Sequence, residues 1–218
     1  TEVTVKILKA PEVVKAALVG FSTIEDAGNC VAEIIAQGCI PAGMEIMDKA
    51  LTKATNDYAK AGYPTDAEAM MIVEFDGTEH EVEDYIGKVK QIAEKNNSSS
   101  LKVSKSNEER LKFWEGRKAA FPACGVLAPD YMCMDGSIPR GKLAEVLNEI
   151  SRLSKKYDLP VANAFHAGDG NLHPLIMFDA NNPDSLRKCE EFGADILKYC
   201  DKVGGALTGE HGVGIEKR

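Results

Sequence analysis

Apolar positions along the chain follow two periods, and the changes between them mark the predicted elements. Short runs that alternate, or that are apolar and β-branched throughout, predict strands, whereas apolar residues spaced three and four apart predict helices. Strands are therefore predicted at residues 3–8, 13–21, 67–75, 101–104, 131–134, 161–166 and 172–178, with a short extended piece at 41–48 and a polar loop at 96–100. Helices are predicted from Thr23 to about Gln37 and at residues 50–61, 79–95, 107–120, 142–157 and 183–203.

The order of these elements indicates the fold class. Strands and helices roughly alternate, and some strands follow one another closely enough to form hairpins. This pattern favours an α+β domain that has a largely antiparallel sheet with helices packed on one face. A parallel, doubly wound sheet is the competing prediction.

Composition narrows the class of protein. The 218 residues allow one large domain or one domain with an appendage, and 44% of them are hydrophobic, which is enough for a substantial core. A formal net charge of −8 argues against nucleic-acid binding, which needs a basic surface. No apolar run approaches the roughly 20 residues of a transmembrane segment. The six cysteines form no CxxC pair, so buried free thiols in a reducing compartment are expected.

Two glycine-rich segments, residues 163–173 and 208–214, carry the candidate chemistry. They hold three of the four histidines in the chain: His166, His173 and His211. Histidine is the side chain best suited to metal ligation and to proton transfer near neutral pH. A single histidine beside a glycine turn is usually a surface residue, but three of them clustered with a carboxylate favour a functional site.

The first segment predicts a pair of metal ligands. A two-residue turn centred on Asp169 and Gly170 would place His166 opposite His173 on paired strands. Directly opposed residues project from the same face with Cβ atoms about 5 Å apart, so the two imidazoles could share one metal ion. In the alternative interpretation, Asp169 and Gly170 form only a turn.

The second segment predicts a third ligand and a base. Glu210 would complete a set of two histidines and one carboxylate, which accepts zinc, iron or manganese and leaves a coordination position open. Adjacent side chains in an extended segment point apart, so His211 would lie beside the metal as a candidate general base. A metallohydrolase, in which the same ligands activate water, and a non-catalytic binding module are the alternatives.

Three charged residues outside these segments, Arg117, Glu45 and Asp48, are also considered. Arg117 follows Trp114 by three residues on a predicted helix, so an aromatic neighbour could orient its guanidinium to clamp a carboxylate. Spacing alone favours the other interpretation, an arginine on the surface. Glu45 and Asp48 are predicted to be solvated acids.

The motifs together resemble a known family. Residues 166–174 (His-Ala-Gly-Asp-Gly-Asn-Leu-His-Pro) and 209–214 (Gly-Glu-His-Gly-Val-Gly) resemble the C-terminal domain of FAD-linked oxidases of the vanillyl-alcohol-oxidase type. That family includes flavin-dependent dehydrogenases of D-2-hydroxyacids, among them enzymes for D-lactate, D-2-hydroxyglutarate and glycolate. The resemblance covers essentially the whole chain, and resemblance to glycolate oxidases extends over residues 40–48, 61–69, 113–118 and 129–139.

The resemblance implies a ferredoxin-like α+β domain that caps the face of a flavin. The FAD-binding domain should precede residue 1 and be absent from this chain, so FAD would be bound mainly by other residues. The chain begins with Thr1 rather than Met and ends at Arg218, shortly after the second motif. We therefore expect residues 1–218 to be a substrate-binding fragment of a longer protein, inactive alone.

The resemblance also implies roles for the site residues. His166, His173 and Glu210 match the ligands of a divalent metal, which acts as a Lewis acid, and His211 matches the base that accepts the hydroxyl proton of the substrate. Hydride would then pass from the α-carbon to the flavin.

Substrate contacts follow from the same resemblance. Arg117 matches an arginine that binds the substrate carboxylate, and Asn171 matches an asparagine at the substrate. Relatives that act on 2-hydroxyglutarate have a lysine where this chain has Cys133, which favours a small monocarboxylic substrate. The expected reaction is oxidation of glycolate to glyoxylate, with D-lactate as the alternative substrate. The expected partners are a second flavin subunit and an iron–sulfur subunit, on the cytoplasmic side of the membrane.

Overall fold

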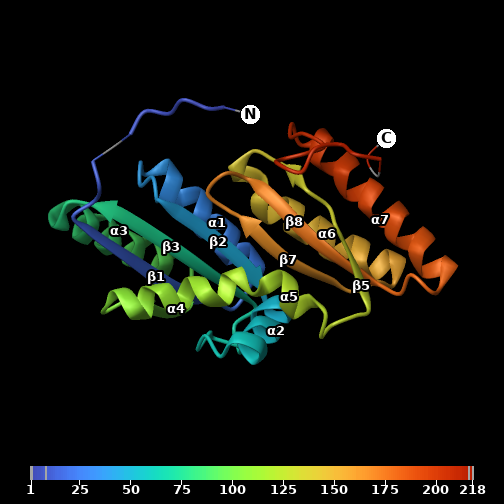
Figure 1. The fold of residues 1–218 in the computed structure, drawn as a ribbon, viewed down its shortest axis with the longest axis horizontal. Helices are drawn as coiled ribbons and strands as arrows, with labels where there is room; N and C mark the ends of the chain where they lie inside the picture. Colours follow the sequence, from blue (N-terminus) through green and yellow to red (C-terminus); the bar gives the residue numbers. More distant parts are fainter. Residues whose placement is uncertain (1, 8, 216, 218) are drawn as a thin grey trace.

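An antiparallel sheet crosses the centre of the molecule in the computed structural model, which describes residues 2–7, 9–215 and 217 (Figure 1). Its strands are β1 (Val13–Phe21), β2 (Gly43–Asp48), β3 (Ala69–Gly77), β4 (Ser98–Val103), β5 (Asp130–Cys133), β6 (Gly136–Ser137), β7 (Val161–His166) and β8 (Asn171–Phe178). Their order is β4-β1-β3-β2-β7-β8-β5, and β6 also pairs with β8. Every pair of named strands is antiparallel, which confirms the predicted class and rules out the doubly wound alternative.

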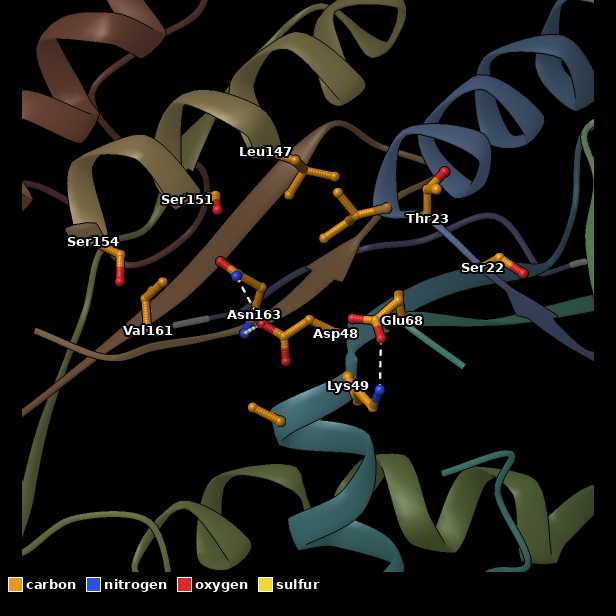
Figure 2. A pocket seen from close by; sticks show the side chains of 12 residues that line it. Ser22, Thr23, Asp48, Lys49, Glu68, Leu147, Ser151, Ser154, Val161 and Asn163 are labelled. Atoms are coloured by element: carbon orange, nitrogen blue, oxygen red, sulfur yellow. Dashed lines mark hydrogen bonds and ion pairs between the residues drawn. The ribbon is translucent and has the colours of Figure 1, made fainter. Parts of the chain in front are cut away.

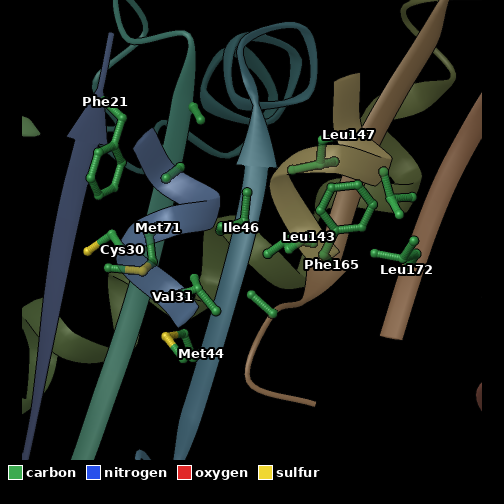
Figure 3. Packing of buried hydrophobic residues seen from close by; sticks show 14 of the residues in the cluster. Phe21, Cys30, Val31, Met44, Ile46, Met71, Leu143, Leu147, Phe165 and Leu172 are labelled. Atoms are coloured by element: carbon green, nitrogen blue, oxygen red, sulfur yellow. The ribbon is translucent and has the colours of Figure 1, made fainter. Parts of the chain in front are cut away.

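Helices cover both faces of the sheet, which corrects the prediction of helices on one face. Beside the larger core cluster lie α1 (Ile24–Ala36), α3 (Glu79–Lys95), α6 (Leu143–Tyr157) and α7 (Pro183–Lys202). Beside the smaller cluster lie α2 (Lys49–Ala59), α4 (Asn107–Lys118) and α5 (Ala120–Cys124). Strand β1 explains the second layer, because Phe21 faces the larger cluster (Figure 3). Val19 is also buried in that cluster, whereas Ala16 and Leu18 are buried in the smaller one. A strand buried on both faces requires cover on both.

Capping side chains mark where α1 and α2 begin. Thr23 accepts a hydrogen bond from the backbone N–H of Asp26 at 3.1 Å and so caps α1. Asp48 caps α2 by accepting from the N–H of Leu51 at 3.0 Å, and it also accepts from the amide of Asn163 (Figure 2). The prediction that Asp48 is a solvated acid is therefore wrong. Its burial raises its pKa to about 6.

Two sequence-based boundaries are also corrected. Residues 2–7 form no strand although they alternate, and Leu8 lies outside the described residues. Alternation makes a strand only where a neighbour supplies hydrogen bonds, and no described strand pairs with this segment. The polar residues 98–100, expected in a loop, belong to β4 because its pairing with β1 overrides their weak strand propensity.

Two further expectations from composition can be compared with the structure. All six cysteines are free, and all are buried except the half-buried Cys133. None of the helices in the described residues is long and apolar enough to cross a membrane.

A glycine allows α4 to pack closely against the rest of the smaller cluster. A Cβ atom on Gly116 would approach the Cβ of Ala61 to 2.7 Å and the Tyr63 hydroxyl even more closely. The Tyr63 hydroxyl donates a hydrogen bond to the carbonyl oxygen of Phe113 in the same helix. The close approach at Gly116 therefore sets how near α4, with the next residue Arg117, lies to Ala61 and Tyr63.

We predict that Gly116→Ala lowers the free energy of unfolding by about 1–3 kcal/mol, because overpacking outweighs the better helix propensity of alanine. Gly87→Ala in α3 is the matched control, since a Cβ there meets no atom of the described residues within 4 Å. It should stabilise the protein by about 0.5–1 kcal/mol. Chemical denaturation measures both, and equal effects of the two substitutions would contradict the packing argument.

Candidate active site

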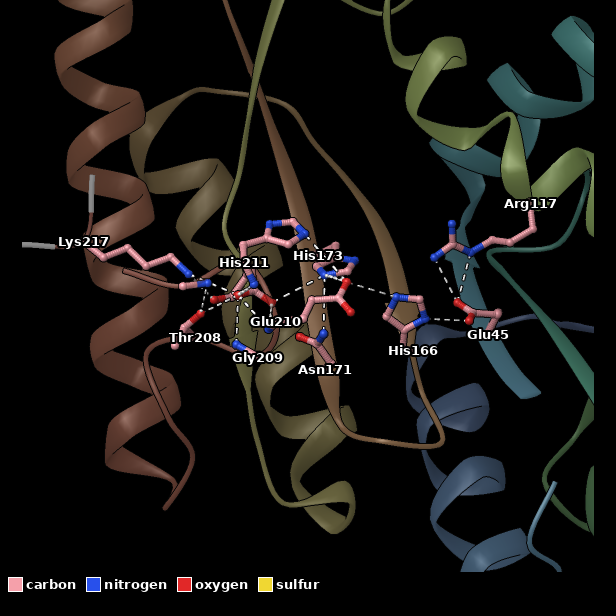
Figure 4. Close-up of polar contacts among 12 residues, drawn as sticks. Glu45, Arg117, His166, Asn171, His173, Thr208, Gly209, Glu210, His211 and Lys217 are labelled. Atoms are coloured by element: carbon pink, nitrogen blue, oxygen red, sulfur yellow. Dashed lines mark hydrogen bonds and ion pairs between the residues drawn. The ribbon is translucent and has the colours of Figure 1, made fainter. Parts of the chain in front are cut away.

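The hairpin of β7 and β8 brings two of the predicted ligands together, although in a different register from the predicted one. His166 pairs with Asn171, and His173 pairs with Ala164. The connecting turn is therefore residues 167–170, four residues rather than two, and the predicted pairing of His166 with His173 is wrong by two positions. The face of a strand repeats every two residues, so this shift leaves both imidazoles on the same side of the sheet. Their ring centroids are 5.0 Å apart (Figure 4).

A buried carboxylate, that of Asp135, holds the second motif beside this hairpin. It accepts hydrogen bonds from the hydroxyl of Thr208 at 2.7 Å and from the backbone N–H groups of Gly209, Glu210 and His211 at 2.9, 3.1 and 3.0 Å. These bonds turn the side chains of Glu210 and His211 toward the histidine pair (Figure 4). The sequence pattern gave no reason to single out Asp135, because the groups that it binds lie at least 73 residues further along the chain.

The charge of Asp135 is stabilised by its surroundings. Its side chain is 0% exposed, and the ammonium of Lys217 lies 3.3 Å from one of its oxygens. Burial alone would raise its pKa, but the hydrogen bonds from Thr208 and the backbone N–H groups outweigh burial and hold the pKa well below the usual range. The carboxylate therefore remains ionised at neutral pH.

His166, His173 and Glu210 meet the requirements of a metal site. Glu210 Oε1 lies 3.5 Å from His166 Nε2 and 3.3 Å from His173 Nε2. Ligand atoms bonded at about 2.1 Å to one tetrahedral ion lie about 3.4 Å from one another. One ligand atom from each of the three residues lies within 4.8 Å of the others. The side chains predicted to bind a metal are thus brought together with suitable spacing.

Both imidazoles are in environments that favour ligation. His166 Nδ1 donates a hydrogen bond to Glu45 Oε1 over 2.6 Å, and this bond raises the pKa of His166. The lone pair of His166 therefore lies on Nε2, which faces Glu210. Burial lowers the pKa of His173, which is 2% exposed, so its ring is neutral. Its Nδ1 is buried and has no hydrogen-bond partner among the described residues. A metal bond at Nε2 would offset part of the cost of burying this ring.

A second group, Asp135, His173 and His211, has similar spacing but is less suited to a metal. The Asp135 oxygens already accept from four donors of the motif and from Lys217, so little lone-pair capacity remains. His211 instead stacks on His173, with ring centroids 4.9 Å apart. His211 is 44% exposed, and its Nε2 lies 3.7 Å from Glu210 Oε1. It is placed beside the predicted ligands, where a base could reach a bound substrate.

Arg117 reaches the site through Glu45. The Arg117 Nε and Nη2 atoms lie 3.0 and 2.9 Å from Glu45 Oε2, and the two residues are 8% and 9% exposed. The predictions of a solvated Glu45 and of a surface arginine are therefore wrong. Trp114 does not orient Arg117, because its indole N–H donates to Glu74 instead. Asn171 Nδ2 lies 3.5 Å from His173 Nε2, which places this predicted substrate contact beside the ligands.

Comparison with known proteins shows the family to which the chain belongs. The family model described as "FAD linked oxidases, C-terminal domain" matches residues 10–218. The chain belongs to this family. It is 51% identical to glycolate oxidase subunit GlcD of Escherichia coli K12 over 217 residues, which cover 100% of this chain and 44% of that protein. It is also 33% identical to the mitochondrial D-lactate dehydrogenase [cytochrome] of Arabidopsis thaliana, covering 100% of this chain and 38% of that protein.

A solved structure supports the fold. That of p-cresol methylhydroxylase with substrate bound matches with a TM-score of 0.66 at 15% identity, over 90% of this chain and 45% of that one. At this identity the likeness shows the fold alone. The chain spans less than half the length of the two curated relatives named above.

We predict that Asp135→Asn releases the second motif. Asparagine can accept fewer of the converging hydrogen bonds and leaves Lys217 without its ion-pair partner, which should cost about 3–5 kcal/mol of unfolding free energy. Hydrogen exchange at the amides of residues 209–211 should accelerate more than exchange in the strands. Asp130→Asn is the control, since among the described residues Asp130 accepts from a single backbone N–H, that of Ala180. Unchanged exchange at 209–211 would show that Asp135 does not anchor the motif.

Proposed function

We propose that this chain is the substrate- and metal-binding domain of a flavin-dependent 2-hydroxyacid oxidoreductase that oxidises glycolate to glyoxylate. The observation that carries the proposal is the convergence of His166, His173 and Glu210, with His211 and Arg117 on either side. A set of ligands, a base and an anion-binding guanidinium together suit oxidation of a small hydroxyacid. The similarity to a glycolate oxidase subunit supports glycolate, and the similarity to a D-lactate dehydrogenase makes D-lactate the second candidate.

Two groups absent from this chain would supply part of the chemistry. When bound, a divalent zinc, iron or manganese ion held by His166, His173 and Glu210 would stabilise negative charge on substrate oxygens, and FAD would accept the hydride. We propose that FAD is bound mainly by residues outside this chain, in a preceding FAD-binding domain. The similarity to curated relatives more than twice as long as the chain supports this proposal.

The residues of the chain would orient the substrate and move one proton. Arg117 would bind the carboxylate of the hydroxyacid, because Glu45 occupies only its Nε and Nη2 atoms. His211 would accept the proton of the 2-hydroxyl group, since its half-exposed ring lies beside Glu210 and His173. Asn171 would donate a hydrogen bond to the substrate. With these contacts the α-carbon hydrogen can be directed toward the flavin.

The proposal extends to partners and location. We propose that the protein works with other subunits of a glycolate oxidase, namely a second flavin subunit and an iron–sulfur subunit. We place the complex in the cytoplasm, on the inner face of the membrane. The description of the Escherichia coli relative as a subunit supports the assembly.

The test is to purify the longer protein that contains this chain and to assay dye reduction. Bound flavin together with dye reduction by glycolate or D-lactate would support the proposal, and their relative kcat/KM values would choose between the substrates. A colourless protein with metal-dependent hydrolytic activity would contradict it and favour a metallohydrolase.

We predict that His211→Ala lowers kcat by about 10²–10⁴-fold, the usual contribution of a general base. Metal content, measured by mass spectrometry, should stay at the wild-type level because His211 is not one of the proposed ligands. His80→Ala is the control, since His80 is an exposed residue at the start of α3. Unchanged turnover in His211→Ala would show that His211 is not the general base.

We predict a preference for monocarboxylates that depends on Cys133. This residue pairs with Leu175, packs against the smaller cluster and carries a neutral thiol, because burial raises its pKa to about 12. Cys133→Lys should raise kcat/KM for 2-hydroxyglutarate relative to glycolate by about 10–100-fold, the worth of one charged hydrogen bond. Cys133→Met, similar in length but uncharged, should not. If the kcat/KM for 2-hydroxyglutarate relative to glycolate is the same in both variants, Cys133 does not determine substrate specificity.

A further inference from the structure

One carboxylate, that of Glu45, contacts both halves of the proposed site. Its Oε1 lies 2.6 Å from His166 Nδ1, while its Oε2 lies 3.0 Å from Arg117 Nε and 2.9 Å from Arg117 Nη2 (Figure 4). The position follows from the sheet, because Glu45 on β2 pairs directly with His166 on β7. Only 9% of Glu45 is exposed, so these contacts are shielded from solvent. Glu45 thus separates a guanidinium from a proposed metal ligand.

The position of Glu45 reduces the repulsion expected between Arg117 and a metal ion bound at His166. A buried guanidinium near a divalent cation repels it, and the repulsion is weakly screened where water is excluded. Arg117 is 8% exposed and is linked to His166 through a single side chain. A negative charge between the two cations turns the repulsive pair into an alternating series of charges.

Glu45 also determines which nitrogen of His166 is available. Because Nδ1 donates its hydrogen to Glu45, the lone pair lies on Nε2, which faces Glu210 Oε1 at 3.5 Å. Carboxylates that accept from the second nitrogen of a ligating histidine fix its tautomer and orientation, and their loss costs about 10–100-fold in metal affinity.

We propose that Glu45 is a positioning and charge-compensating residue that allows His166 to hold a divalent cation next to the buried guanidinium of Arg117. This inference rests on the proposed metal site. Glu45 itself is not a ligand: both of its oxygens are engaged, one with each neighbour. It acts through His166 and Arg117.

The chain contains a matched control for this role. Glu74 on β3 is also paired with an arginine of α4, with 2.9 Å between Glu74 Oε2 and Arg110 Nη1. Its side chain is 14% exposed and that of Glu45 is 11% exposed, so their burial is similar. Glu74 also accepts from Trp114 but contacts no histidine. Substitution of Glu74 therefore removes a comparable ion pair but leaves the contacts of the proposed metal ligand His166 unchanged.

The experiment compares metal affinity in the full-length protein. Titration with Mn²⁺ or Zn²⁺ against a chromophoric chelator should give a dissociation constant about 10–100-fold higher for Glu45→Gln than for wild type. Glutamine can accept from His166 or from Arg117, but not from both without turning its NH₂ group toward a donor. Glu74→Gln should stay within about twofold of wild type, since it lacks this role. Equal affinities of Glu45→Gln and wild type would overturn the proposal.

A double variant separates charge compensation from a general structural effect. In Glu45→Gln the guanidinium is unpaired, so adding Arg117→Gln should recover part of the lost metal affinity. Arg117→Gln alone should bind metal at least as tightly as wild type. A double variant that binds no more tightly than Glu45→Gln would overturn the charge-compensating role. Folding of each variant is checked by its thermal midpoint.

The outcome does not depend on turnover. If the wild-type protein binds metal but oxidises neither glycolate nor D-lactate, the proposed function fails, while the metal affinities of the five proteins still decide the role of Glu45. If the protein oxidises glycolate and the affinities do not change as described, the role of Glu45 fails alone.

Discussion

The hydrogen-bonded carboxylate of Asp135 is the contact on which the rest of the site depends. The segment from Thr208 to His211 is mostly exposed and has little apolar surface with which to pack. Its position comes instead from the donors that converge on Asp135. The approach is so close that a Cβ atom on Gly209 would lie 2.7 Å from Asp135 Oδ1. A glycine is therefore required next to Glu210 in this structure.

The strand order explains how distant parts of the chain reach one place. Neighbouring strands β2, β7 and β8 carry Glu45, His166 and His173, and α4 on the same side of the sheet supplies Arg117. Each of these side chains belongs to a regular element, whose geometry is fixed by packing and by backbone hydrogen bonds. Glu210 and His211 are the exception, since they belong to a loop. This difference explains why a buried anchor is needed there and not elsewhere.

The sequence predicted the parts of the site that depend on local pattern. His166 and His173 were paired correctly in space despite the wrong register, because an error of two residues keeps the face of a strand. Asp135 and Glu45 were missed because their roles depend on partners far away in the chain: Glu45 and His166 are 121 residues apart. Their surroundings in sequence resemble those of a turn and of a half-buried strand. The second layer of helices was missed for a similar reason, since it depends on which strands are central.

Formal charges in the site favour one class of substrate under the proposed function. Glu45, Asp135 and Glu210 bring three negative charges, and Arg117 and Lys217 bring two positive ones, which leaves one net negative charge. Histidines that ligate a metal are neutral. A divalent cation would change the net charge to plus one, and a monocarboxylate substrate would then bring it to zero. A dicarboxylate would leave an uncompensated negative charge, which is costly where water is excluded. Under the proposed function, the neutral thiol of Cys133 would likewise suit glycolate or lactate better than a longer diacid.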